Sequence, residues 1–125
     1  MKYPAITKLI LSKGVDAVTV PENIRAEVMS EAGYLLFKEG RYKESGMAFG
    51  KAKDTKAIIE IADWLEQQGR FSTASLFLLY SGAKERMEKC ALSCMDQGEF
   101  DEAIRLYEKT GNVEMIHFIR KNVDL

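Results

Sequence analysis

The chain has 125 residues, of which 46% are hydrophobic and 30% charged, and its formal net charge at pH 7 is −1. This length is enough for one domain with a continuous core, and a charge so close to zero excludes the global basic field that holds nucleic acid. Pro4 and Pro21 are the only prolines, so the remainder of the chain favours helices.

The cysteines and the short apolar runs indicate in which cellular compartment the protein is expected. Cys90 and Cys94 are the only cysteines and lie four residues apart in a helical stretch, which does not suggest a disulfide framework. The apolar runs are far shorter than the roughly 20 residues of a membrane-spanning helix. Lys8 interrupts the first of them, and no small-residue cleavage pattern follows. We therefore predict a cytoplasmic protein without a membrane segment, and Met1 favours a complete small protein.

The first twenty residues predict one short helix and a loop. Residues 4–12 are expected to be helical, with Ile6, Leu9 and Ile10 on one side. Residues 13–20 are expected to be a loop or briefly extended.

A longer helix is expected from residue 21 to about Glu39. Thr19 stands three residues before Glu22, which fits a capping box, and Pro21 suits the first turn. Gly40 is expected to end this helix, because glycine adopts the left-handed conformation at low cost. The apolar stripe of the helix comprises Ile24, Val28, Ala32, Leu35 and Leu36.

Gly40, Gly69 and Gly98 follow one another at intervals of 29 residues and open the same phrase each time. The residue two positions on is aromatic, the residue five on is small, and the residue nine on is large and apolar. A fixed period of this length is typical of helical repeat arrays, which usually bind other macromolecules. The period predicts helices over residues 41–53, 55–68, 71–81, 84–97, 100–110 and 113–122.

The buried faces of the predicted helices share the same period. The stripe predicted for 55–68 returns 29 residues later and begins a third time near the C-terminus, where the last helix is expected to be a cap with Lys121, Asn122 and Asp124 in water. The first two stripes are Ile58, Ile61, Ala62 and Leu65, and then Met87, Cys90, Ala91 and Cys94.

The phrase around the first glycine, AGYLLFKEGRYKES with Phe49 and Ala52 beyond it, resembles the tetratricopeptide repeat. The resemblance covers roughly residues 27–122. It departs from the family in its shorter period, against about 34 residues, and in lacking the proline that usually ends each repeat. In both respects the chain is similar to the α-solenoid segments of clathrin, coatomer and intraflagellar-transport proteins.

This resemblance implies an all-α fold: a right-handed α–α superhelix of about three antiparallel helix pairs with capping helices. Within each pair the first helix is called helix A and the second helix B. Gly33, Ala62 and Ala91 would hold the small helix-A position where the paired helices approach closely. The expected single domain, 1–125, divides into an N-terminal cap helix and loop, 1–21, repeats 22–53, 54–82 and 83–111, and a C-terminal cap helix, 112–125.

If helix A lines the concave side, its outward positions carry eight acids against three lysines, with apolar residues among them, while helix B is more basic. Such a groove would suit a basic, partly apolar helix or extended peptide of another protein. The chain is thus expected to be an adaptor or scaffold. The residues expected to contact the partner are Tyr34, Phe37, Lys38, Ile59, Asp63, Glu66, Leu92 and Met95.

Two other binding functions stay open. A helical-repeat RNA-binding protein would carry basic surroundings, which the predicted acidic groove argues against. Residues 38–56 hold six basic and three acidic side chains and residues 96–114 hold two basic and six acidic ones, so copies could stack end to end, or the chain could dock onto a longer solenoid.

No catalytic signature is found, and no cofactor or metal is expected. Cys90, Cys94 and His117 are the only soft metal-ligand set, but the cysteine positions align with core residues. Residues 46–51 are one residue short of a phosphate-binding loop and fall within a predicted helix. Gly46 and Gly50 more plausibly permit close helix packing.

Overall fold

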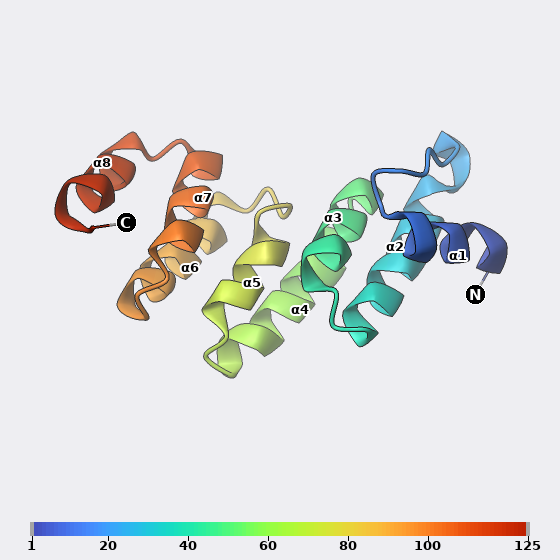
Figure 1. The fold of residues 1–125 in the computed structure, drawn as a ribbon, viewed down its shortest axis with the longest axis horizontal. Coiled ribbons are helices and arrows are strands. Elements are labelled where there is room, and N and C mark those ends of the chain that lie inside the picture. Colours follow the sequence, from blue (N-terminus) through green and yellow to red (C-terminus); the bar gives the residue numbers. More distant parts are fainter. Residues whose placement is uncertain (1, 125) are drawn as a thin grey trace.

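The computed structural model describes residues 2–124, and these fold into helices joined by short turns without any strand (Figure 1). The all-α class predicted from the sequence is confirmed. The helices are α1 (Pro4–Lys13), α2 (Glu22–Lys38), α3 (Tyr42–Ala52), α4 (Thr55–Gln67), α5 (Phe71–Leu78), α6 (Lys84–Asp96), α7 (Phe100–Thr110) and α8 (Val113–Asn122). Every helix expected from the period is present, and α5 is the one that ends clearly early.

The recurring glycines end α2, α4 and α6 in the same way. Gly40, Gly69 and Gly98 all have positive φ, at 77°, 72° and 77°. The amide that follows each glycine bonds back to a carbonyl five residues earlier, as from Arg41 to Leu36 at 2.9 Å. This double-bonded helix end needs a left-handed residue, which glycine supplies without a Cβ clash.

Small residues set the distance between the two helices of a pair. A Cβ on Gly33 of α2 would lie 2.8 Å from the Phe49 ring of α3, so only glycine allows this approach. Ser45 of α3 donates a hydrogen bond to the Gly33 carbonyl at 2.7 Å. At the equivalent positions of α4 and α6, Ala62 and Ala91 are fully buried. The close approach predicted at this position is therefore seen at Gly33, and the two alanines are buried at the equivalent positions.

The pairs follow one another in a row with the two ends of the chain at opposite ends (Figure 1). The Cα atoms of α3 and α5 come within 8 Å of one another, as do those of α5 and α7, whereas within residues 2–124 none of α2 and α4, or of α4 and α6, come so close. Gly46 and Gly50 explain the first contact: a Cβ on Gly46 would overlap the Leu76 carbonyl oxygen, and one on Gly50 would lie 2.9 Å from the Tyr80 ring. The helix-A side is thus the more widely spaced side, and the expected concave curvature there is not confirmed.

Residues 2–20, which comprise α1 and the loop after it and which we call the leader, cover the first helix pair, α2 and α3. Ile10, Val15 and Val20 are buried in one cluster with residues of α2 and α3, and Arg41 donates a hydrogen bond to the Leu11 carbonyl at 2.9 Å. Leu9, predicted to share the inner side of this helix, is instead 46% exposed. Thr7 takes an inner position and donates hydrogen bonds to the Tyr3 carbonyl and to Glu31.

The predicted capping box at the start of α2 is wrong. The helix begins at Glu22, two residues too late for Thr19 to cap it, and the residue before it, Pro21, makes no side-chain cap. Arg25 instead donates to the Val20 carbonyl at 3.0 Å and so ties the loop to the first turn.

The last helix ends the row. Ile116 and Ile119 of α8 are buried, while Lys121, Asn122 and Asp124 are exposed as expected. Arg120 stands 29 residues after Ala91, at the small position that receives helix B, and it is exposed.

Candidate functional site

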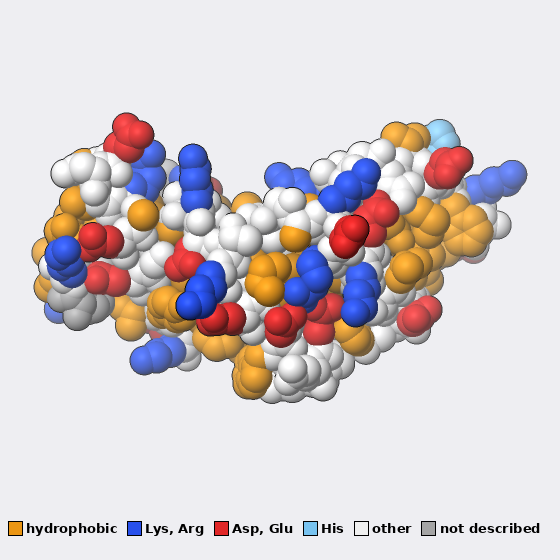
Figure 2. Space-filling view, turned by 180° about the vertical axis from the view of Figure 1, so that it is seen from behind, with side chains coloured by type: hydrophobic (Ala, Val, Ile, Leu, Met, Phe, Trp, Pro, Cys, Tyr) orange, Lys and Arg blue, Asp and Glu red, His pale blue; other side chains and the backbone are white. Residues whose placement is uncertain are grey.

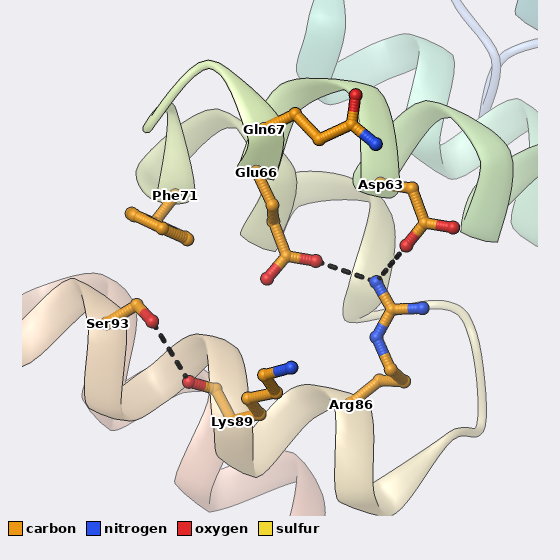
Figure 3. Close-up of a pocket in the computed structure, with 7 residues that line it drawn as sticks. All are labelled: Asp63, Glu66, Gln67, Phe71, Arg86, Lys89 and Ser93. Atoms are coloured by element: carbon orange, nitrogen blue, oxygen red, sulfur yellow. Dashed lines mark hydrogen bonds and ion pairs between the residues drawn. The ribbon is translucent and has the colours of Figure 1, made fainter.

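A large surface hollow lies between α4 and α6, the helix-A members of the second and third pairs. Its volume is about 500 Å³. Figure 3 shows side chains from both helices directed toward the space between them. The lining residues are Asp63, Glu66, Gln67, Phe71, Arg86, Lys89 and Ser93. We call this hollow the central groove.

Arg86 bridges the two helices across the central groove (Figure 3). Its Nη2 donates to Asp63 Oδ1 at 2.6 Å and to Glu66 Oε1 at 2.7 Å. Partial burial alone would lower the pKa of Arg86, but the hydrogen bonds to Glu66 and Asp63 outweigh this and raise it. The two acids expected to attract a basic partner are therefore already paired within the chain.

Lys89 also points into the central groove, where Figure 3 shows its amine between the two helices. Within residues 2–124 it makes no ion pair, since Arg86 occupies both carboxylates. The central groove thus contains two acids and two cations, and its net formal charge is zero.

The 29-residue period assigns equivalent residue positions on either side of the central groove. Subtracting 29 from each lining position gives Tyr34, Phe37, Lys38, Tyr42, Ala57, Glu60 and Trp64, between α2 and α4. Adding 29 gives Leu92, Met95, Asp96, Phe100, Met115, Phe118 and Asn122, between α6 and α8. We call these sets the first groove and the third groove, and the three together the helix-A face. Two register positions change from aromatic to acidic to apolar along the row: Tyr34, Asp63 and Leu92, and Phe37, Glu66 and Met95.

Aromatic rings fill much of the first groove. The Phe37 ring lies 6.0 Å from that of Trp64 and 5.4 Å from that of Tyr42, and Tyr34 packs edge-on against Phe49 at 4.9 Å. Burial of the Tyr34 hydroxyl, with Asp54 and Glu60 nearby, raises its pKa. Tyr34 and Trp64 still expose 47% and 48% of their surface, which leaves two large rings available to a partner.

The structure distributes the predicted partner-binding residues over all three grooves. Tyr34, Phe37 and Lys38 belong to the first groove, Asp63 and Glu66 to the central one, and Leu92 and Met95 to the third. Ile59 is half-buried and packs against the core. Only Asp63 and Glu66 are joined through a common partner, Arg86.

Sequence reasoning missed three residues of this surface: Arg86, Trp64 and Phe118. Phe118 follows Lys89, an expected outward position, by 29 residues, so the period contained a signal for Phe118. Arg86 follows Ala57 by the same interval, but Ala57 is buried, so the period contained no signal for Arg86. Nothing in the sequence shows that the Arg86 side chain would reach two acids on the preceding helix.

The expected acidic face is more balanced than the sequence suggested. Glu27 pairs with Lys2 at 3.1 Å, and Arg86 pairs with two further acids. Figure 2, seen from the side on which α4 and α6 lie, shows basic and acidic side chains interspersed with hydrophobic ones. On helix B, Arg41, Lys51 and Arg105 are likewise held in ion pairs.

The weaker chemical candidates have structural explanations. Cys90 and Cys94 are fully buried in the core, and Cys90 donates a weak hydrogen bond to the Phe71 carbonyl at 3.5 Å. A hydrogen bond with Cys94, together with burial, raises the pKa of the Cys90 thiol and keeps it protonated. His117 is exposed on α8, and no group of three or more His, Cys, Asp and Glu within residues 2–124 has the geometry of a metal site. Residues 46–51 lie inside α3 and cannot form a phosphate loop.

Searches against protein-family models, curated proteins and solved structures find no match for this chain. Across residues 2–124, every helix falls short of the length and apolar character that crossing a bilayer requires.

Proposed function

We propose that the chain is a protein–protein interaction module, a small adaptor or scaffold, that binds a helix or extended peptide of another protein across the helix-A face. One observation carries this proposal: the central groove, about 500 Å³ in volume, shares the helix-A face with large exposed apolar side chains. Tyr34 and Trp64 flank it on one side, and Leu92 and Phe118 on the other, each about half exposed. Large exposed apolar side chains that gather on one face of a protein often mark a site where another macromolecule binds.

The wide spacing of the helix-A members supports the same proposal. Because α4 and α6 are bridged by side chains rather than packed backbone to backbone, the surface between them is corrugated. Corrugations of this kind receive the side chains of an added helix or strand. The tetratricopeptide-like superhelix, with helix A as the peptide-binding element, is part of this proposal.

The mixed charges of the helix-A face favour a protein over RNA. Single-stranded RNA is held by basic grooves with stacking aromatic rings. The first groove has the rings, but its charged members are one lysine and one glutamate, and the central groove is neutral overall. A protein segment that uses apolar anchors and few charges fits these grooves better.

Selection of peptides from a random display library against the whole chain tests the proposal. Selected peptides should lose binding to Trp64→Ser or Arg86→Glu and keep binding to Leu9→Ser, a matched exposed position on α1 outside the helix-A face. Peptides that bind all of these variants equally would place the interaction elsewhere and overturn the proposal.

A further inference from the structure

A second hollow lies where the loop between α1 and α2 meets the first turns of α2 and the end of α3. Its volume is about 330 Å³, a size that suits a small ligand or a single modified side chain. Asp16 and Thr19 line it from the loop, Arg25 and Met29 from α2, and Lys51 from α3. We call it the loop hollow, and it shares no residue with the grooves of the helix-A face.

Positive charge prevails in the loop hollow. Arg25, Lys51 and Lys53 line it, and Asp16 is the one acid among the described residues that do so. A smaller hollow of about 150 Å³ adjoins it and is lined by the same three cations and by Glu22. The positive end of the α2 dipole and the negative end of the α3 dipole both lie here and offset one another. The side chains therefore set the sign of the charge, with three cations against two acids over both hollows.

The chain itself engages these cations only in part. Lys51 pairs with Asp16 at 3.2 Å in an exposed contact. Arg25 donates from Nε and Nη2 to the Val20 carbonyl at 3.3 and 3.0 Å, which fixes the guanidinium and leaves Nη1 without a hydrogen bond inside residues 2–124. Lys53 makes no ion pair and no side-chain hydrogen bond in the described part of the chain. Donors for an anion are thus already in place.

Lys53 occupies a backbone position that glycine fills elsewhere. Its φ is 55°, and Gly82 and Gly111, which follow it at successive intervals of 29 residues, have φ of 69° and 77°. A lysine in this conformation carries strain that glycine would avoid, and strained positions often coincide with binding sites. The next residue, Asp54, does not pair with Lys53, because its carboxylate caps α4 and accepts a hydrogen bond from Ser30. The side chain of Lys53 is therefore kept at a cost to the backbone.

We propose that the loop hollow binds the phosphate group of a phosphomonoester, with Lys53 and Arg25 as donors to its oxygens and Lys51 as the third cation. Lysine and arginine are the side chains that hold phosphate in proteins. The lining residues carry an excess of two positive charges, which matches a phosphomonoester of about −1.5 to −2 better than a single carboxylate. Met29 and the exposed Thr19 line the remaining space and would contact the group that bears the phosphate.

Titration of the whole ¹⁵N-labelled chain, followed by amide NMR shifts, tests the proposal. The probes are inorganic phosphate, glycerol phosphate and N-acetyl-phosphoserine amide, at constant ionic strength and about pH 7.5, where phosphate is mostly dianionic. Saturable shifts are expected at residues 16–20 and 50–54, with binding of acetate at least about fivefold weaker. Tighter binding of glycerol phosphate would identify a free small molecule as the source of the phosphate, and tighter binding of the phosphoserine probe would identify a phosphorylated protein; each supports the site.

Lys53→Gly is the most informative variant, because binding and stability should change in opposite directions. It should weaken phosphate binding at least about tenfold, while loss of the strained lysine raises the thermal unfolding midpoint. Asp16→Asn should strengthen binding about two- to fivefold, since it removes the acid that competes for Lys51. Lys43→Ala, an exposed lysine of α3 outside the loop hollow, is the matched control and should bind as the original chain does.

Three results would overturn the inference: no saturable shift with any phosphate probe, equal affinity for acetate and phosphate, or unchanged affinity in Lys53→Gly. A loss in Lys43→Ala as large as that in Lys53→Gly would also overturn it, because it would show general attraction of anions to surface lysines. The proposed function is tested by other probes and by variants of the helix-A face, so failure of one proposal leaves the other standing.

Discussion

Arg86 on α6 donates a hydrogen bond to Glu66 on α4 at 2.7 Å and so joins two helix-A members whose backbones do not pack together. The same guanidinium nitrogen reaches Asp63, and both contacts lie partly in solvent. The bridge therefore organises the central groove more than it stabilises the fold.

Arg86→Ala should lower the free energy of unfolding by only about 1 kcal/mol or less, because partly exposed ion pairs contribute little. It should also leave the central groove with two unpaired acids and weaken binding of the library-selected peptides, because the bridge that shapes this groove is lost. Urea denaturation and peptide anisotropy measure the two effects. A loss of several kcal/mol would show that the bridge is a structural contact.

Gly46→Ala should destabilise the protein by about 1–3 kcal/mol through overpacking, despite the better helix propensity of alanine. The new methyl group would meet the Leu76 carbonyl oxygen, which belongs to the α5 backbone and cannot rotate away. Lys43→Ala, at an exposed position of the same helix, should change stability by less than about 0.5 kcal/mol. Equal stability of the two variants in urea would show that α5 moves freely away from α3.

Lys53→Gly should stabilise the protein by about 1 kcal/mol. Lys53 follows the end of α3 at φ 55°, the only positive φ of a non-glycine residue within residues 2–124. Lys51→Gly, two residues earlier inside α3, should instead destabilise by about 1 kcal/mol. Opposite shifts in the unfolding midpoint would confirm the left-handed position, and shifts of the same sign would contradict it.

Stability should fall in acid partly through Glu88. Hydrogen bonds from Thr110 and Asn112 lower the pKa of Glu88 in the folded chain, so its contribution is present above the unfolded pKa, near about 4.5, and is lost as the pH falls through the folded value. Unfolding measured between about pH 6 and pH 3 should show a smaller loss in Glu88→Gln than in the original chain. Glu85→Gln, on the exposed face of the same helix, should follow the original chain, and identical pH profiles for all three would exclude this role.

The two cysteines should react with a thiol reagent only on unfolding. Both are fully buried, and the raised pKa of Cys90 removes the reactive thiolate at neutral pH. The reaction rate in urea should therefore rise together with the loss of helical circular dichroism. Rapid reaction in buffer alone would show that this part of the core opens without global unfolding.

The helix pattern was predictable because its causes are local. A left-handed residue is needed wherever a helix ends in the double-bonded turn, and Gly40, Gly69 and Gly98 meet that need at a constant interval. The small helix-A residues followed from the same register. The errors concern residues whose environment is set by distant segments. Leu9 lies outside the buried cluster that residues 2–20 form with α2 and α3. Thr19 does not cap α2, because the helix begins only at Glu22.

The candidate site was predictable in its residue types but not in its pairing. Tyr34, Leu92 and Met95 were found because outward positions of a regular helix can be counted along the chain. Arg86 was not found to neutralise Asp63 and Glu66, because that contact depends on where α6 lies relative to α4.

The sequence alone determined that this protein is a row of short helices with small residues between paired members, because glycine turns and apolar periodicity act within a few residues. Only the tertiary structure decided that α3 and α5 approach more closely than α2 and α4, and that Arg86 bridges Asp63 and Glu66 across the central groove. These features depend on distances between helices, which result from side-chain packing and from bridges such as that of Arg86, and no local propensity encodes them.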